Sequence, residues 1–357
     1  MPATIVQSNT TAFKTRVIDP VTLDIIENAL RNARVEMDTT LVRTAMSPGI
    51  REQGDAFPLI ADHKGRMIVG QFGSYIGPFL DGFSGTVEDG DMIFLSDPYS
   101  VQGAISHNND WLVLLPVFKD GRLIAYTSMF GHQSDIGGMV AGSMPIDATS
   151  IFQEGVRIPP VKIWKQGVYN EDLIKLVMHQ TRTPEWCRAD LNALIAACRV
   201  ASRRVVEMAE RFGDDVFVSA CEMLLARNHR AMKALIEQAI GEDKVSFEDY
   251  ICDDGLGYGP YKIKCTMWRE NGRVVLDFAA NIALVAEHRG VGDQPPVLEH
   301  RQQHKPVVGV ANCAFAAVGI GQEDHVAVFQ RAIKAAQKAV DEAAELADDH
   351  FAGVIGD

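Results

Sequence analysis

The clearest pattern in the N-terminal part of the sequence is a helical period that begins at residue 19. Asp19-Pro20 offers an N-cap side chain followed by proline at the first helical position. Apolar residues then recur every three to four positions, at Leu23, Ile26, Leu30, Met37, Leu41 and Ala45. This spacing predicts an amphipathic helix that ends near Ser47-Pro48-Gly49.

Short apolar runs separated by turn residues follow this helix, and they predict strands. The runs cover residues 57–61, 67–69, 92–95, 111–118 and 123–130. Between the last two runs, Asp120-Gly121 has the signature of a tight hairpin turn. Regular pairing around that turn places Asp110 opposite Gly131 and His107 opposite Ser134. Both open ends of the hairpin would then deliver polar side chains to one place.

The second half of the chain alternates between helical and strand patterns. Apolar spacing predicts helices over about 183–213 and 214–240, and an Asn271-Gly272 turn predicts a hairpin of 261–268 with 274–278. The tail over about 326–347 is alanine-rich and helical in pattern. We therefore expect an α+β fold with an antiparallel, strand-rich lobe, a helical lobe, and a C-terminal hairpin plus helix. The expected divisions are residues 1–160, 161–243 and 244–357.

Composition and charge narrow the class of protein. The 357 residues include 34 Lys and Arg against 47 Asp and Glu, a net charge of −13 without a basic run. This balance argues against a nucleic-acid or anionic-membrane partner. The longest apolar stretch, Trp111 to Phe118, is too short to span a bilayer, and Met1 to Arg16 lacks an apolar leader core. We expect a cytoplasmic protein with reduced, structural cysteines.

The ends of the predicted hairpin carry the candidate chemistry. His107, Asp110 and His132 form a set of two histidines and one carboxylate, which suits Mn²⁺, Fe²⁺ or Zn²⁺ and leaves positions open for water or substrate. Asp55, just before another predicted strand, can add a ligand. The competing interpretation is that these residues only cap strands and face solvent in turns.

The loop after the hairpin adds two further candidates. Asp135 either orients a metal-bound histidine or is a surface residue of the glycine-rich segment 135–145. That segment either offers backbone amides to an oxyanion or is a set of tight turns. Glu154 is either a proton acceptor beside the metal or an ion-pair partner of Arg157. No P-loop motif is present, so a nucleotide would not be bound that way.

These segments, taken together, resemble the hydantoinase B family. This family includes the B-type chain of N-methylhydantoinase, the large metal-bearing chain of acetone carboxylase, chains of acetophenone carboxylase and caprolactamase, and the C-terminal half of 5-oxoprolinase. The resemblance runs from about Asp19 to Phe278. The segments that carry it are 19–23, 43–45, 96–99, 132–139, 142–145 and 152–160.

The resemblance implies a two-part, ATP-dependent system. A hydantoinase A-type ATPase subunit would phosphorylate a cyclic amide or ketone, and the B-type subunit would complete hydrolysis or carboxylation at its metal. The metal pattern of acetone carboxylase falls on His107, Asp110 and His132, and an upstream aspartate ligand of related amidohydrolases falls on Asp55. The implied assembly is a hetero-oligomer.

The chain departs from the family after Ala280, where Asn281 to His288 does not match the expected segment. Family members are also considerably longer. One hypothesis is a frameshift that replaced the C-terminal third, and the alternative is a genuinely shortened member. Three functions therefore stay open: a subunit of a hydantoinase- or lactamase-like amidohydrolase, the large subunit of a ketone carboxylase, or a truncated, non-catalytic subunit.

Overall fold

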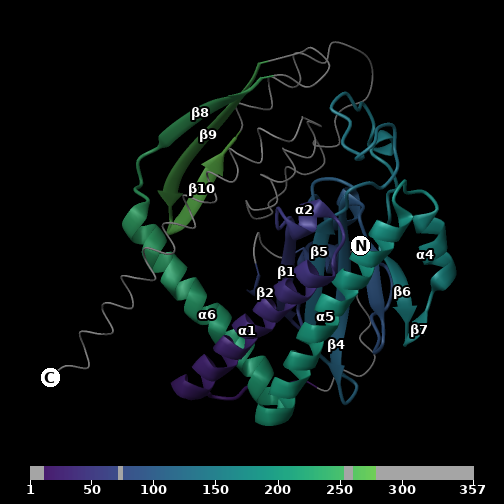
Figure 1. Cartoon of the computed structure of the whole chain (residues 1–357). Helices are drawn as coiled ribbons and strands as arrows, with labels where there is room; N and C mark the ends of the chain where they lie inside the picture. Colours follow the sequence, from purple (N-terminus) through teal and green to yellow (C-terminus); the bar gives the residue numbers. More distant parts are fainter. Residues whose placement is uncertain (1–11, 71–74, 253–259, 279–357) are drawn as a thin grey trace. The chain divides into compact units, whose positions relative to one another are not determined.

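The computed structural model describes residues 12–70, 75–252 and 260–278 (Figure 1). It divides into two compact units at Asn228 and His229, within helix α6 (Asp214–Ala239). In the described part of the chain, no helix combines the length and apolarity needed to cross a membrane. The predicted C-terminal helix and the proposed frameshift lie outside the described residues.

The first unit begins with helix α1 (Pro20–Thr44), as the sequence predicts. The Asp19 side chain accepts a hydrogen bond from the Thr22 backbone N–H at 2.9 Å, and Pro20 occupies the first turn. Both features stabilise a helix start, because the first turn has amide groups without partners inside the helix. The residues that α1 buries share the predicted period: Leu23, Ile26, Leu30, Ala33, Met37 and Leu41.

A seven-stranded sheet forms the centre of this unit. Its strands, all antiparallel to their neighbours, run in the order β2-β1-β5-β4-β3-β6-β7. Their bounds are β1 Ala56–Asp62, β2 Met67–Val69, β3 Met92–Leu95, β4 Asp110–Lys119, β5 Arg122–His132, β6 Val161–Lys165 and β7 Val168–Tyr169. The predicted α+β class is confirmed.

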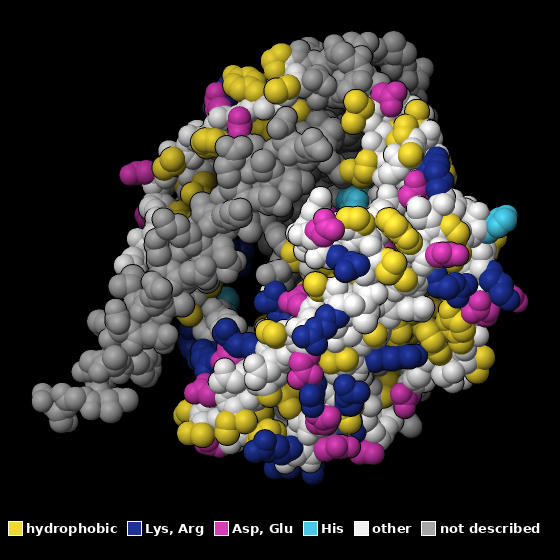
Figure 2. Space-filling view, viewed as in Figure 1, with side chains coloured by type: hydrophobic (Ala, Val, Ile, Leu, Met, Phe, Trp, Pro, Cys, Tyr) yellow, Lys and Arg dark blue, Asp and Glu magenta, His cyan; other side chains and the backbone are white. Residues whose placement is uncertain are grey.

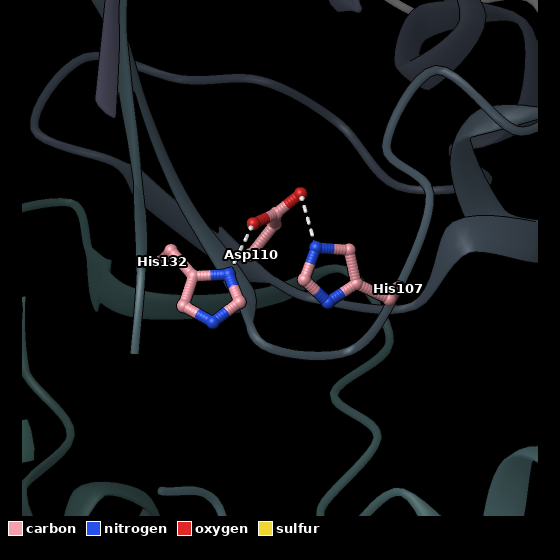
Figure 3. A group of neighbouring side chains, drawn as sticks. All are labelled: His107, Asp110 and His132. Atoms are coloured by element: carbon pink, nitrogen blue, oxygen red, sulfur yellow. Dashed lines mark ion pairs between the residues drawn. The ribbon is translucent and has the colours of Figure 1, made fainter. Parts of the chain in front are cut away.

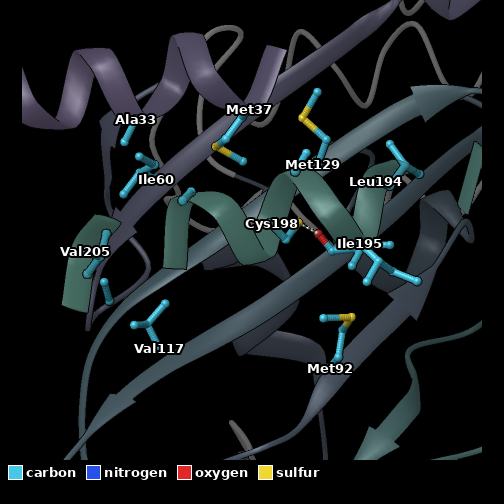
Figure 4. Close-up of a cluster of buried hydrophobic side chains, with 14 of the residues drawn as sticks. Ala33, Met37, Ile60, Met92, Val117, Met129, Leu194, Ile195, Cys198 and Val205 are labelled. Atoms are coloured by element: carbon cyan, nitrogen blue, oxygen red, sulfur yellow. Dashed lines mark hydrogen bonds between the residues drawn. The ribbon is translucent and has the colours of Figure 1, made fainter. Parts of the chain in front are cut away.

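Helices cover both faces of this sheet. On one face, α1 and α5 (Pro184–Phe212) pack over alternate strand residues such as Val117 and Met129 (Figure 4). On the other face, α3 (Ile76–Gly82) and the 3₁₀ helix η1 (Pro98–Val101) pack over the intervening residues. Strand β4 is therefore buried on both sides, which explains its nearly continuous apolar run.

The central hairpin of β4 and β5 corrects the predicted register. Asp120 and Gly121 both have positive φ, which matches the predicted tight turn, and Lys119 pairs with Arg122. A β-bulge then follows, because Phe118 pairs with Leu123 whereas Val117 pairs with Ala125, which leaves Ile124 as the extra residue. The predicted pairing of Asp110 with Gly131 is therefore wrong by one position.

Three short helices complete the first unit. Helix α2 (Pro48–Arg51) follows α1, the 3₁₀ helix η2 (Ile151–Gln153) lies in the long loop, and α4 (Glu171–Met178) precedes α5. Strand β6 pairs with β3, so residues on both sides of the predicted division at residue 160 contribute to one sheet. The division into three parts stays a prediction.

The second unit contains a three-stranded antiparallel sheet. Strands β8 (Val245–Ile251), β9 (Tyr261–Glu270) and β10 (Arg273–Asp277) have the order β10-β9-β8. The predicted Asn271-Gly272 turn joins β9 to β10, and both residues have positive φ. Inside this unit, the Arg269 backbone N–H donates to the Gly241 carbonyl at 2.9 Å.

Candidate metal centre

Three side chains predicted as metal ligands meet at the open end of the β4–β5 hairpin. Asp110 begins β4, His132 ends β5, and the two residues are direct cross-strand partners. One carboxylate oxygen of Asp110 lies 3.4 Å from His132 Nδ1, and the other lies 3.3 Å from His107 Nε2 (Figure 3). One potential ligand atom from each residue lies within 4.8 Å of the others.

The bulge at Ile124 explains why this cluster forms. Without the extra residue, Asp110 would pair with Gly131, and His132 would project from the opposite face of the sheet, because side chains alternate along a strand. The observed register instead places Asp110 and His132 side by side on one face. His107 reaches the same point from the turn that precedes β4.

Burial and charge together define the electrostatics of the cluster. Burial alone would raise the pKa of Asp110, but the adjacent imidazoles of His107 and His132 hold this pKa far below its usual range. Burial alone would lower the pKa of His107, yet the carboxylates of Asp110, Glu154 and Asp55 raise it above the ordinary value. Asp110 is thus held as a carboxylate anion between two imidazole rings.

The donor set fits a divalent transition metal. Two imidazoles and one carboxylate are ligands that Zn²⁺, Mn²⁺ and Fe²⁺ accept, and three protein ligands leave positions open. Among the described residues, buried His132 Nδ1 has no hydrogen-bond partner, although it lies 3.4 Å from a carboxylate oxygen of Asp110. Buried polar atoms normally have a partner, so an orphaned ring nitrogen beside a carboxylate is consistent with a metal ligand.

Asp55, the fourth predicted ligand, lies at the edge of this cluster. Its Oδ2 atom is 3.7 Å from His132 Nδ1, and its backbone carbonyl accepts a hydrogen bond from the His132 N–H at 3.0 Å. Its side chain is 45% exposed, whereas that of Asp110 is 10% exposed. Burial, and then repulsion from Asp110, raise the pKa of Asp55. Asp55 therefore flanks the three-residue cluster from the side open to solvent.

Glu154 lies on the His107 side of the cluster. Its Oε2 atom accepts a hydrogen bond of 3.4 Å from the Asn108 backbone N–H. Burial raises the pKa of Glu154, and the Asn108 amide and the His107 charge only partly oppose this effect. Glu154 does not form the alternative ion pair with Arg157. The Arg157 guanidinium instead lies 4.0 Å from Asp97 and over the Phe152 ring.

Asp135 organises the glycine-rich loop. Its carboxylate accepts hydrogen bonds from the backbone N–H groups of Gly137 and Gly142 and from Arg182. Burial would raise the pKa of Asp135, but these donors lower it. The loop amides of Gly137 and Gly142 are thereby occupied, which favours the interpretation of the segment as tight turns. A role for Asp135 in orienting a metal-bound histidine stays a prediction.

A buried amide network that the sequence did not predict adjoins the cluster. Asn109 is fully buried, and its Nδ2 donates to the carbonyls of Gln133 and Gly142. The Gln133 N–H donates in turn to the Asn109 carbonyl at 2.8 Å. Asn109 directly precedes Asp110 in the sequence, and Gln133 directly follows His132. Amide residues next to two predicted ligands were therefore the signal from which this network could have been predicted. This network ties the start of β4 to the end of β5 and to the loop.

A family model described as hydantoinase B/oxoprolinase matches residues 19–287. The beta subunit of caprolactamase from Pseudomonas jessenii is 35% identical over 255 residues, which cover 69% of this chain and 43% of that protein. The acetophenone carboxylase delta subunit of Aromatoleum aromaticum is 29% identical over 195 residues, covering 52% and 28%. The chain thus spans less than half the length of these relatives.

Solved structures agree with these sequence matches. The crystal structure of the ATP-dependent caprolactamase from Pseudomonas jessenii superposes with a TM-score of 0.65 at 31% identity, covering 74% of this chain and 47% of that one. A nucleotide-free acetone carboxylase structure gives a TM-score of 0.65 at 18% identity, covering 73% and 37%, which shows the shared fold. The chain belongs to the hydantoinase B/oxoprolinase family.

Proposed function

We propose that this chain is the metal-bearing, B-type subunit of an ATP-dependent amidohydrolase that opens a cyclic amide together with an A-type ATPase subunit. The observation that supports this proposal most directly is the cluster of His107, Asp110 and His132 at the open end of the central hairpin. The similarity to the beta subunit of caprolactamase supports the amide as substrate class.

The three residues of the cluster share one task in this proposal, which is to hold a metal ion. His107, Asp110 and His132 would hold a divalent ion, which would supply Lewis acidity that polarises a carbonyl and lowers the pKa of water. Asp110 contributes the negative charge, and its low pKa keeps it ionised. The amide network of Asn109 and Gln133 holds the two strand ends in register, so the ligand atoms need little reorganisation.

Proton transfer is assigned to Glu154. Burial raises the pKa of Glu154, and a raised carboxyl pKa favours exchange of a proton at neutral pH over that of an ordinary glutamate. The Asn108 N–H fixes Oε2, so the same atom can accept a proton from water and return it to the leaving nitrogen. Asp55, more exposed and 3.7 Å from His132, would orient water at the open side.

The first test is the metal content of the purified chain by mass spectrometry. We expect about one Mn, Zn or Fe per chain in the wild type and less than about a tenth of that in His132→Ala and His107→Ala, because each loses one of three ligands. His179→Ala is the matched control, since His179 caps α4 at an exposed position. Equal metal content in His132→Ala and His179→Ala would contradict the assignment of the ligands.

The second test adds a co-purified A-type ATPase subunit, ATP and a lactam or hydantoin. We expect ring opening that requires ATP and metal, and a loss of at least about 100-fold in kcat for Glu154→Gln with metal content unchanged. Metal-dependent ATP hydrolysis that requires a ketone and bicarbonate would instead assign the carboxylase function. A metal-free chain that still binds the ATPase subunit would indicate a non-catalytic subunit.

A further inference from the structure

A second concave site lies in the first unit, between helix α5 and the β6–β7 hairpin. It is an open groove of about 590 Å³. Its charged and aromatic lining residues are Trp164, Tyr169, Glu171, Arg188, Arg199 and Arg203. Figure 2 shows Lys and Arg side chains over α5 beside hydrophobic side chains over β6 and β7. None of these groups belongs to the metal centre.

The floor of the groove is aromatic and is fixed by the sheet. Trp164 and Tyr169 are direct cross-strand partners, and their ring centroids are 4.3 Å apart. The guanidinium of Arg199 lies 4.7 Å from the centroid of the Trp164 ring. A stacked guanidinium keeps its edge N–H groups free, so Arg199 can still donate hydrogen bonds to a ligand.

Three arginines but only one glutamate line the groove, so the groove has a net positive charge. Arg188 is paired with Glu171 at 3.2 Å. Within the described ranges, Arg199 and Arg203 have no carboxylate within 4.0 Å, and both are exposed. They lie four residues apart on α5 and therefore on the same helix face. This face is positive in a chain whose net charge is −13.

The length of the groove along α5 selects the class of ligand. Its lining runs from Arg188 to Arg203, which are fifteen positions apart on one helix, or about 22 Å. A small carboxylate cannot span that distance, whereas about seven residues of extended polypeptide can. A nucleic acid would meet the strongly negative remainder of the chain. The aromatic floor is suited to an apolar side chain.

We propose that this groove binds an acidic polypeptide segment of a partner protein. Carboxylates of the segment contact Arg199 and Arg203, and an apolar side chain packs on Trp164 and Tyr169. Arginine presents a planar set of donors that matches a carboxylate, so two such contacts in register give orientation as well as affinity. The proposal does not depend on the metal centre.

The test uses a fluorescein-labelled twelve-residue peptide of glutamates with two leucines, measured by fluorescence anisotropy with the full chain. We expect Arg199→Glu/Arg203→Glu to weaken binding at least about 10-fold, since two attractive contacts become repulsive. Arg43→Glu/Arg211→Glu is the matched control, because both arginines are exposed on helices and lie outside the groove. We expect the control to change affinity less than about twofold.

Three results would overturn the proposal. The first is equal weakening in the groove variant and the control, which would indicate attraction to net charge alone. The second is comparable binding of an oligothymidylate of the same charge, which would indicate a phosphate-binding surface. The third is full competition by about 10 mM free glutamate, which would indicate a small-ligand site. Circular dichroism of each variant confirms that it is folded before binding is compared.

Discussion

The two sheets of the molecule differ in how far their side chains are buried. In the first unit, β3 and β4 place apolar side chains on both faces, and helices bury them. In the second unit, none of the described side chains of β8, β9 and β10 is buried, and Phe247 is 67% exposed. Both regions show strand patterns and tight turns in the sequence. Alternation therefore predicts a strand, but burial on two faces is what makes the first sheet a rigid support for the cluster of His107, Asp110 and His132.

The largest expected effect compares one residue type in the two sheets. Phe94→Ala should lower the free energy of unfolding by about 3–5 kcal/mol, because Phe94 is fully buried against Trp111 with ring centroids 5.1 Å apart. Phe247→Ala should change it by no more than about 0.5 kcal/mol. Urea unfolding followed by circular dichroism measures both variants. A comparable loss in the two would mean that the second sheet also packs against a core.

A smaller effect compares two serines. Ser47 is buried and donates its hydroxyl to Asp190, which also accepts the Ser47 and Met46 backbone N–H groups. Ser47→Ala should cost about 1–3 kcal/mol, since it leaves part of a buried carboxylate without a donor. Ser246 bonds to Thr266 at an exposed position, so Ser246→Ala should be neutral within about 0.5 kcal/mol. Thermal unfolding ranks the two, and a larger loss for Ser246→Ala would reverse the comparison.

The smallest effect depends on pH. Ion pairs with Arg66 and Lys64 lower the pKa of Glu222 from 4.5 to about 2. A depressed carboxyl pKa stabilises the fold above about pH 4.5, and this contribution is lost as the pH falls toward 2. Because Glu222 is 41% exposed, solvent screening limits Glu222→Gln to about 1 kcal/mol at pH 7.

The control for this prediction is in the second unit. Glu248→Gln removes ion pairs with Lys262 and Lys264, and we expect it to have less effect than Glu222→Gln at pH 7, because only Glu222 pairs with an arginine. Denaturant midpoints at pH 7 and pH 3 separate the two glutamates. We expect the difference between wild type and Glu222→Gln to shrink at pH 3. A difference that grows at low pH would contradict the assigned direction of the pKa shift.

The sequence predicted the elements whose causes are local. Helix α1 follows from its cap and its 3.6-residue period, and both tight turns follow from Asp-Gly and Asn-Gly, which tolerate positive φ. Helix α4 and strands β6–β8 were not predicted. Strands β6 and β7 are short and half-buried, and β8 alternates little, so their patterns are weak.

Only part of the candidate site was predicted: its three side chains were, whereas the strand register that brings them together was not. His107, Asp110 and His132 can each cap a strand, but two imidazoles and a carboxylate at the mouth of one hairpin suit a metal, and resemblance to a family supported the same three positions. The register behind them could not be predicted, because nothing in the local sequence marks Ile124 as an extra residue. Tertiary packing decides where a bulge forms, since Ile124 is fully buried in the core beneath α5.

The bulge at Ile124 has a consequence for how the gene can be edited. Replacing Ile124 by another apolar residue keeps the number of residues between Asp110 and His132, so the two side chains stay on one face. Removing or adding a single codon within that stretch changes the number of residues between Asp110 and His132. One of these two side chains then turns to the other face of the sheet. For this hairpin, the number of residues between Asp110 and His132 matters more to the pairing of these two side chains than the identity of most residues in that stretch.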